Sequence, residues 1–194
     1  TEKLFRIPDY QRGYAWTESQ LLDFWSDLNQ IPDDGTHYTG VLTLENVPLP
    51  VQERWVGDRW IIESKGFDPL YVVDGQQRLT TSIILIQCIC ESLLNDEDAL
   101  NYTTRKEIQK KFIFDTRDGG VSRSYIFGYE RDNPSYEYLK TEIFREISVS
   151  DRKEETVYTN NLSFAKDFFN DRISSLDRSE IEKIYLKVTQ KILF

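Results

Sequence analysis

The sequence predicts an α/β (α+β) domain, in which a small mixed sheet with packed helices is followed by a helical subdomain. Up to about residue 95, short runs with the two-residue period of β-strands alternate with runs of helical period. One helical run is apolar on nearly every side, which is typical of a buried central helix. After residue 95 the chain carries mixed charge and helical patterns. We therefore expect a sheet-based first part and a helical second part.

The first elements are a short strand and an amphipathic helix. Because proline favours extended geometry in the residue before it, Pro8 predicts a strand or arm in segment 5–16 that runs into a turn. Thr17 is expected to begin a helix, with Gln20 completing a capping box three residues later. Apolar residues then recur at helical spacing on one face: Leu21, Leu22, Phe24, Trp25 and Leu28. This helix should pack on a sheet.

Three strands are expected next, at residues 38–45, 60–63 and 70–73. The first of them alternates with the two-residue period of a strand. Two prolines within residues 46–58 predict a loop between the first strand and the second. A helix is expected from about residue 77 to 94, and its apolar side chains nearly encircle it. That helix should form the buried centre of the domain.

The second half of the chain shows helical patterns at residues 134–147, 157–176 and 179–193. The clearest pattern places these residues on one face: Leu162, Ala165, Phe169, Ile173 and Leu176. We accordingly divide the chain into a core of residues 1–95 and a helical subdomain of residues 96–194. The apolar helical pattern at its end leads us to expect that this subdomain is truncated at its C-terminal end.

Composition limits the classes of function. The chain has 194 residues, of which 39% are hydrophobic, enough for one fair-sized core or for one core plus a small helical annex. Its 24 basic and 33 acidic residues give a net charge of −9, so the surface as a whole repels a polyanion and a dedicated DNA-binding module is not expected. Cys88 and Cys90 do not face each other at helical spacing, so no disulfide is expected. Without a secretory or membrane-spanning segment, we expect a cytoplasmic location and no membrane partner.

The junction between the third strand and the central helix predicts a phosphate site. A strand that turns at once into a helix brings unpaired backbone N–H groups and the positive end of the helix dipole to one spot. Gly75 permits the tight turn, and Arg78 offers a planar fork of donors. Gln76 and Gln77 can donate to oxygens or orient a water, and Asp74 can hold a divalent metal ion. Thr80 and Thr81 add hydroxyl groups in the first helical turn.

The same residues also allow a purely structural interpretation, in which Asp74 caps the helix, Gly75 makes the turn and Arg78 is a surface charge. A second cluster, at residues 8–16, interleaves polar groups with three aromatic residues. Here Arg12 can make a second phosphate contact, and Tyr14 or Trp16 can stack on a base. The alternative is that these aromatic side chains, Trp16 above all, fill the core.

The single histidine, His37, has no cysteine or histidine at ligand spacing. We expect it in an exposed loop rather than in a zinc site or a catalytic triad. With only one histidine, the chain also has no histidine-asparagine-histidine nuclease motif.

Three motifs together resemble the N-terminal domain of GmrSD-type bacterial restriction proteins. They are Ile-Pro-x-Tyr-Gln-Arg-x-Tyr-x-Trp at residues 7–16, Tyr38-x-Gly40, and Val-Asp-Gly-Gln-Gln-Arg-Leu-Thr-Thr at residues 73–81. They cover about the first 95 residues, and Tyr158-x-Asn160-Asn161 resembles a weaker family feature. The resemblance implies a ParB/sulfiredoxin-like core followed by helices. It also implies binding and hydrolysis of a nucleoside triphosphate, which governs a nuclease domain directed at phage DNA, often with modified bases.

The resemblance adds Gln11 and Arg12 to the expected pocket. We expect Arg78 and Arg12 on phosphates, Asp74 on water or on a metal ion such as Mg²⁺, and a glutamine that orients the attacking water. The expected catalytic residues are Asp74, Gln76, Gln77 and Arg78. The expected nucleotide-binding residues are Gln11, Arg12, Tyr14, Gly75, Arg78, Thr80 and Thr81.

The leading hypothesis is an NTPase domain that regulates a nuclease domain or subunit on its C-terminal side. Phage DNA would be contacted only through the full-length protein, and a homodimer is left open. One alternative is a module that senses nucleotide without hydrolysing it, or that grips modified DNA. Another is a nuclease that uses the ParB-like fold directly, against which the acidic net charge argues.

Overall fold

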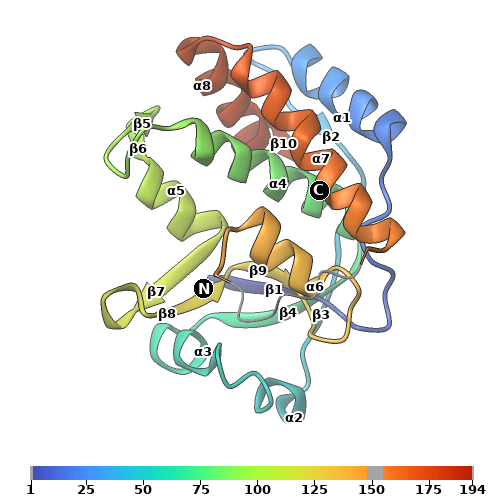
Figure 1. Cartoon of the computed structure of the whole chain (residues 1–194), viewed down its shortest axis with the longest axis vertical. Helices are drawn as coiled ribbons and strands as arrows, with labels where there is room; N and C mark the ends of the chain where they lie inside the picture. Colours follow the sequence, from blue (N-terminus) through green and yellow to red (C-terminus); the bar gives the residue numbers. More distant parts are fainter. Residues whose placement is uncertain (1, 148–154, 194) are drawn as a thin grey trace.

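A four-stranded mixed sheet lies at the centre of the computed structural model, which describes residues 2–147 and 155–193. The strand order is β3-β4-β1-β9 (Figure 1). The strands are β1 (Lys3–Ile7), β3 (Thr43–Asn46), β4 (Asp68–Asp74) and β9 (Phe127–Tyr129). Strand β1 pairs in parallel with β4 and β9, whereas β3 pairs antiparallel with β4. The expected α+β class and the small mixed sheet are confirmed.

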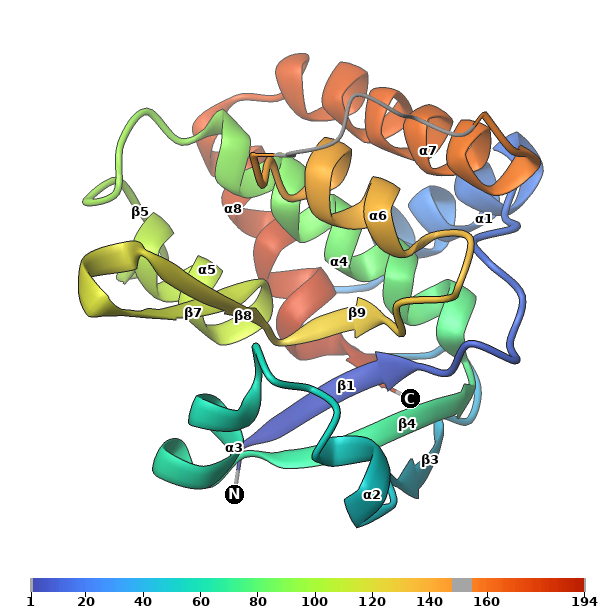
Figure 2. The same cartoon turned by 60° about the horizontal axis from the view of Figure 1, so that its bottom comes forward.

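Helix α4 (Gln76–Ser92) is the central element of a helical layer on one side of this sheet (Figure 2). Around it lie α1 (Glu18–Gln30), α5 (Arg105–Phe112), α7 (Val157–Ser174) and α8 (Arg178–Leu186). Helices α5, α7 and α8 contact α4 directly, and α1 packs on α7. Every residue of α4 from Thr80 to Cys90 is buried, which confirms the expected central helix. The predicted start of α1 is also confirmed, because Thr17 N–H donates to Gln20 Oε1 at 2.9 Å.

The expected strand at residues 60–63 is wrong. These residues belong to helix α3 (Arg59–Lys65), which lies with α2 (Leu49–Gln52) on the other side of the sheet from α4 (Figure 2). Trp60 and Ile61 are buried in a small apolar cluster with residues of β1 and of the segment that follows α3. A short apolar run with no clear period fits a strand and a buried helix equally well, which explains the error.

The expected strand at residues 38–45 is divided in two. Strand β2 (His37–Tyr38) ends before Gly40, whose φ of 117° breaks the extended conformation, and β3 begins at Thr43. Strand β2 pairs in parallel with β10 (Ile192–Leu193) rather than joining the central sheet. The segment from Gly40 to Leu42 is therefore a connection that crosses the C-terminal end of β4.

The second half contains strands as well as helices. Hairpins form from β5 (Ala99–Leu100) with β6 (Thr103–Thr104), and from β7 (Phe114–Arg117) with β8 (Ser122–Tyr125). These strands and β9 have no counterpart in the sequence prediction. The pattern at 157–176 corresponds to α7. The pattern at 134–147 corresponds to the shorter α6 (Tyr136–Tyr138) and a π-helical turn to Ile143, and the pattern at 179–193 to α8, a second π-helical turn and β10.

One hydrophobic core draws on both halves of the chain, with residues from α1, α4, α7 and β9. The division into two domains at residue 95 stays a prediction. Phe194, at the end that was expected to be truncated, lies outside the described residues. Cys88 and Cys90 are free and buried in α4, as expected, and burial raises the pKa of both thiols to about 12. Within the described ranges, no helix is long and apolar enough to cross a membrane.

Candidate functional site

Strand β4 passes into α4 through a single residue, Gly75, with φ 83° and ψ 4°. This left-handed conformation favours glycine. A Cβ atom at residue 75 would also lie 2.9 Å from Leu42 Cδ1 and 3.1 Å from the Val41 carbonyl oxygen. Gly75 itself is the N-cap of α4, and the neighbouring Asp74 accepts the Gly75 N–H through Oδ1 at 2.8 Å. Asp74 is therefore a turn residue rather than the helix cap.

The first turn of α4 presents free backbone donors. None of the described residues accepts a hydrogen bond from the N–H groups of Gln76, Gln77 or Arg78. The first N–H of the helix with a partner is that of Leu79, which donates to the Gly75 carbonyl at 3.1 Å. A cavity of about 200 Å³, called the α4 cavity below, lies at this end of the helix. Its lining residues are Arg12, Trp16, Asp74, Gly75, Gln76, Gln77 and Arg78.

The Arg78 side chain is held against the connection between β2 and β3. Its Nη2 donates to the Val41 carbonyl at 2.6 Å. A Cβ atom at Gly40 would lie 2.6 Å from Arg78 Nη1, so only glycine allows the guanidinium to approach the backbone this closely. Arg78 Nε is buried and has no hydrogen-bond partner in the part of the chain that the structure describes. An unpaired buried donor is costly, so an anionic acceptor in the cavity would stabilise this arrangement.

The side chains of Gln11 and Gln76 form a short chain of hydrogen bonds. Gln11 Nε2 donates to the Val73 carbonyl at 3.2 Å, and Gln11 Oε1 accepts from Gln76 Nε2 at 3.1 Å. Because a backbone carbonyl can only accept a hydrogen bond, the contact with Val73 fixes which end of the Gln11 amide is Nε2, and the contact with Gln11 then fixes the Gln76 amide. Gln76 Oε1 is then a buried acceptor without a partner among the described residues. It suits a group in the cavity that donates a hydrogen bond, such as a water molecule.

Gln77 uses both ends of its amide on the backbone of segment 11–16. Its Oε1 accepts from Ala15 N–H at 2.7 Å, and its Nε2 donates to the Gly13 carbonyl at 3.1 Å. Segment 11–16 carries Arg12 and Trp16 to the α4 cavity. Gln77 therefore positions these two residues rather than offering free polar groups of its own.

Three of the expected nucleotide-binding residues lie in the core rather than in the cavity. Tyr14 is fully buried, and its hydroxyl shares a hydrogen bond with Thr81 Oγ1 at 2.8 Å. Thr80 is also fully buried, with its hydroxyl 3.1 Å from that of Tyr129. Both threonine hydroxyls donate to helix carbonyls one turn earlier. Their physical role is to satisfy polar groups beneath the cavity, and they line no part of it.

Arg12, Trp16 and Asp74 do line the cavity. Arg12 is exposed and has no side-chain partner among residues 2–147 and 155–193. Trp16 is half-buried and packs edge-on against Phe24, with ring centroids 6.1 Å apart. In the described ranges, no three His, Cys, Asp or Glu side chains are grouped as metal ligands. Asp74 by itself fits an ion such as Mg²⁺, which usually takes one or two carboxylates and completes its shell with phosphate oxygens and water.

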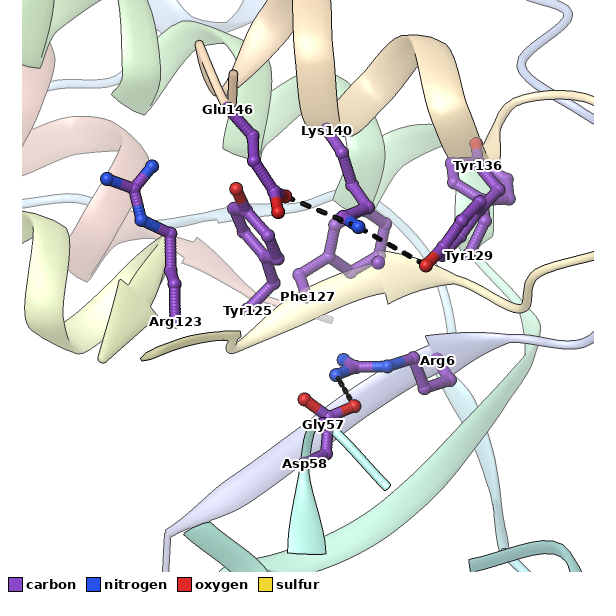
Figure 3. Close-up of a pocket in the computed structure, with 11 residues that line it drawn as sticks. Arg6, Gly57, Asp58, Arg123, Tyr125, Phe127, Tyr129, Tyr136, Lys140 and Glu146 are labelled. Atoms are coloured by element: carbon purple, nitrogen blue, oxygen red, sulfur yellow. Dashed lines mark hydrogen bonds and ion pairs between the residues drawn. The ribbon is translucent and has the colours of Figure 1, made fainter. Parts of the chain in front are cut away.

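A different cavity of about 130 Å³, the sheet cavity, serves for comparison (Figure 3). Of the three cations that line it, Arg6 and Lys140 are paired with anions inside the cavity, whereas Arg123 lies over the Phe114 ring. Arg6 Nη2 lies 2.6 Å from Asp58 Oδ2, and Lys140 Nζ lies 3.3 Å from Glu146 Oε2. Both arginines of the α4 cavity lack an acidic partner among the described residues, and they lie beside the free N–H groups of α4. Unpaired cations beside free N–H groups favour the α4 cavity as the place where an anion binds.

Fold and site together define a mixed α/β domain with a donor-lined cavity at a strand–glycine–helix turn. The whole described chain matches a family model, that of the GmrSD restriction endonuclease N-terminal domain, over residues 1–193. The chain belongs to this family, and the resemblance stated from its motifs is confirmed. No curated protein matches it significantly. The match extends beyond the three motifs. Residues of the first and third motifs line the α4 cavity, and Gly40 of the second lies against Arg78.

The structure also adds residues that motif analysis did not assign. Val41 and Leu42 hold Arg78 and cover Gly75, although the motif pattern pointed only to Tyr38 and Gly40. The available signal was the glycine itself, because an isolated glycine beside a strand often marks a close backbone approach. His37 lies half-buried in β2 rather than in a loop, with Nε2 3.5 Å from Asp27 Oδ2.

The clamp formed by Gln77 gives a stability prediction. Gln77→Ala leaves the Ala15 N–H and the buried Gly13 carbonyl without partners, so we expect the free energy of unfolding to fall by about 1–3 kcal/mol. Urea denaturation measures the change. Gln190→Ala, at an exposed residue, is the control and should alter stability by less than about 0.5 kcal/mol. Equal stability of Gln77→Ala and the parent would show that the clamp does not hold segment 11–16.

Proposed function

We propose that this domain binds a nucleoside triphosphate with its phosphates in the α4 cavity, hydrolyses it, and thereby regulates the DNA-cleaving domain of a restriction protein that acts on modified phage DNA. The observation that carries the proposal is a set of donors at one spot that have no partner among the described residues. These are the buried Nε of Arg78 and the N–H groups of residues 76–78. Oxygens of a phosphate chain can accept from all of them at once.

The charge distribution supports a small anion rather than a DNA backbone as the ligand. The protein carries a net charge of −9, yet the α4 cavity brings together Arg12 and Arg78 with a single carboxylate, that of Asp74. A surface that neutralises many successive phosphates needs a broad basic patch. Two unpaired arginines at a helix N-terminus suffice for the few phosphates of a nucleotide.

The proposed chemistry follows from the hydrogen-bonding groups that each side chain leaves without a partner among the described residues. Phosphoryl transfer depends mainly on positioning and on neutralising charge. Arg78 and Arg12 bind phosphate oxygens, and Gln76 Oε1 accepts a hydrogen bond from the attacking water and orients it. We assign the water to Gln76 rather than to Gln77, because both ends of the Gln77 amide already bind the backbone. A Mg²⁺ ion bound at Asp74 would supply further neutralisation of phosphate charge.

A nucleotide sensor that does not hydrolyse its ligand is the second candidate function. It is favoured by the scarcity of candidate bases, since Asp74 is the single carboxylate among the described residues that line the α4 cavity. In that case nucleotide binding alone would signal to the nuclease domain. Release of inorganic phosphate from each of the four ribonucleoside triphosphates, measured with Mg²⁺, distinguishes the two candidates.

Arg78 gives the most direct prediction about binding. Arg78→Ala should weaken nucleotide affinity by at least one to two decades, because a charge-assisted hydrogen bond contributes about 1.5–3 kcal/mol. The fold should remain intact, since Arg78 makes one side-chain hydrogen bond at the protein surface. Arg78→Lys keeps the charge but loses the planar fork and should recover only part of the affinity. Calorimetric titration with a triphosphate and Mg²⁺ measures these effects.

The matched control for this experiment is Arg123→Ala, which removes an arginine from the sheet cavity. It should bind the triphosphate as the parent does, and thermal melts of every variant report whether the fold persists. Parental affinity in Arg78→Ala, or a loss of affinity in Arg123→Ala of the same size, would contradict the placement of the phosphates.

Gln76 gives a prediction that separates binding from chemistry. If Gln76 Oε1 orients the attacking water, Gln76→Ala should lower kcat for phosphate release by about tenfold or more, the value of one hydrogen bond of about 1.5 kcal/mol. Its nucleotide affinity should change far less, because a carbonyl oxygen does not bind phosphate. The comparison of kcat with Kd is the readout. A variant with parental kcat would remove Gln76 from the mechanism.

A further inference from the structure

A second cavity adjoins the α4 cavity and shares two of its residues. It has a volume of about 370 Å³ and is called the α1 cavity here. Its walls come from α1, through Asp23, Phe24 and Asp27, and from β2, through Tyr38. Trp16 and Arg78 line both cavities and so mark the boundary between them. Of the three sequence motifs, Tyr38-x-Gly40 alone contributes a described residue, Tyr38, to these α1 and β2 walls.

The two cavities differ in their balance of charge: the α4 cavity is lined by two arginines and one carboxylate, whereas the α1 cavity is lined by two carboxylates and the shared Arg78. The α4 cavity contains Arg12, Arg78 and the free N–H groups of the helix turn. The α1 cavity contains the carboxylates of Asp23 and Asp27, which lie on successive turns of α1. His37 Nε2 faces one of them, Asp27, at 3.5 Å. Phosphate oxygens are repelled by these carboxylates, whereas O–H and N–H donors are attracted. A ligand that spans both cavities therefore has its anionic end at α4 and a donor-rich end at α1.

Aromatic side chains provide the remaining surface of the α1 cavity. Trp16 and Phe24 pack edge to face at its boundary, with an interplanar angle of 60°. Tyr38 is 64% exposed, although it lies at the cavity wall. Within the described ranges its ring is not stacked on another aromatic ring. Trp16 and Tyr38 thus leave aromatic surface on which a planar heterocycle can stack.

Size favours a site that extends beyond the α4 cavity. Sites for small molecules usually measure about 300–1,000 Å³, and the α4 cavity alone lies below this range. We propose that the α1 cavity binds the nucleoside part of the nucleotide, with Trp16 and Tyr38 beside the base and with Asp23 and Asp27 as acceptors for its N–H and O–H groups. This inference rests on the proposed function, because it takes the phosphates to lie in the α4 cavity. Selectivity among nucleotides then resides in α1 and β2.

The test compares a nucleotide with a phosphate chain that lacks a nucleoside. Affinities are measured by calorimetry for ATP, GTP, CTP, UTP and inorganic tripolyphosphate, each with Mg²⁺. We expect the preferred nucleotide to bind at least about tenfold more tightly than tripolyphosphate, a difference that one well-made hydrogen bond to a charged group can supply. Tyr38→Ala and Asp27→Asn should each reduce this ratio severalfold. The ratio is the readout because a change in overall charge affects both ligands alike.

Matched controls come from the far parts of the chain. Tyr102→Ala removes a fully exposed tyrosine, and Asp167→Asn removes an exposed carboxylate of α7; both should leave the ratio unchanged. Equal affinity for nucleotides and tripolyphosphate would overturn the inference while leaving the phosphate site in place. A ratio that Tyr38→Ala and Asp27→Asn do not reduce would overturn it as well. Failure of tripolyphosphate and all four nucleotides to bind would instead overturn the proposed function, and the inference with it.

Discussion

Strand β4 becomes helix α4 across one residue, Gly75, whose left-handed φ of 83° favours glycine. A Cβ atom at this position would also crowd Leu42 and the Val41 carbonyl. The abrupt turn leaves the first N–H groups of α4 without partners in the described part of the chain, at the end of a parallel pair of strands. Because α4 is buried almost throughout, the core holds this end of the helix in place. A rigid core element thus presents free donors at the surface, which an anion-binding site requires.

The surrounding side chains depend on the same turn. Gln76 and Gln77 point from the first turn of α4 toward segment 11–16, where one bonds to Gln11 and the other clamps the backbone beside Arg12. Arg78, one residue on, reaches the connection after β2 at Val41. The two glutamines look equivalent in the sequence, but the hydrogen bonds give them different tasks. Gln77 holds the backbone of segment 11–16, whereas Gln76 keeps an acceptor without a partner among the described residues. Placement in the GmrSD restriction endonuclease N-terminal family gives these contacts a context in DNA restriction.

Local patterns predicted the parts of this structure that local forces decide. The capped helix α1, the buried α4 and the β4–α4 turn follow from periodicity, capping residues and a glycine, all within a few positions. Contacts between distant residues escaped prediction. Arg78 meets Val41 across 37 positions, and β9 joins the sheet from the second half of the chain. The burial of Tyr14 likewise depends on distant residues, because its hydroxyl bonds to Thr81 in the packed core. The sequence alone therefore did not show that this aromatic side chain lies beneath the cavity and not in it.

The central claim is that phosphate oxygens bind the free donors at the start of α4. Nuclear magnetic resonance of the ¹⁵N-labelled chain during titration with tripolyphosphate and Mg²⁺ tests it most directly, because each donor has its own signal. The account predicts that the largest shifts fall on the backbone N–H groups of Gln76, Gln77 and Arg78 and on Arg78 Nε–H. Unchanged signals at these groups, with shifts at Arg6 or Lys140 of the sheet cavity instead, would contradict it.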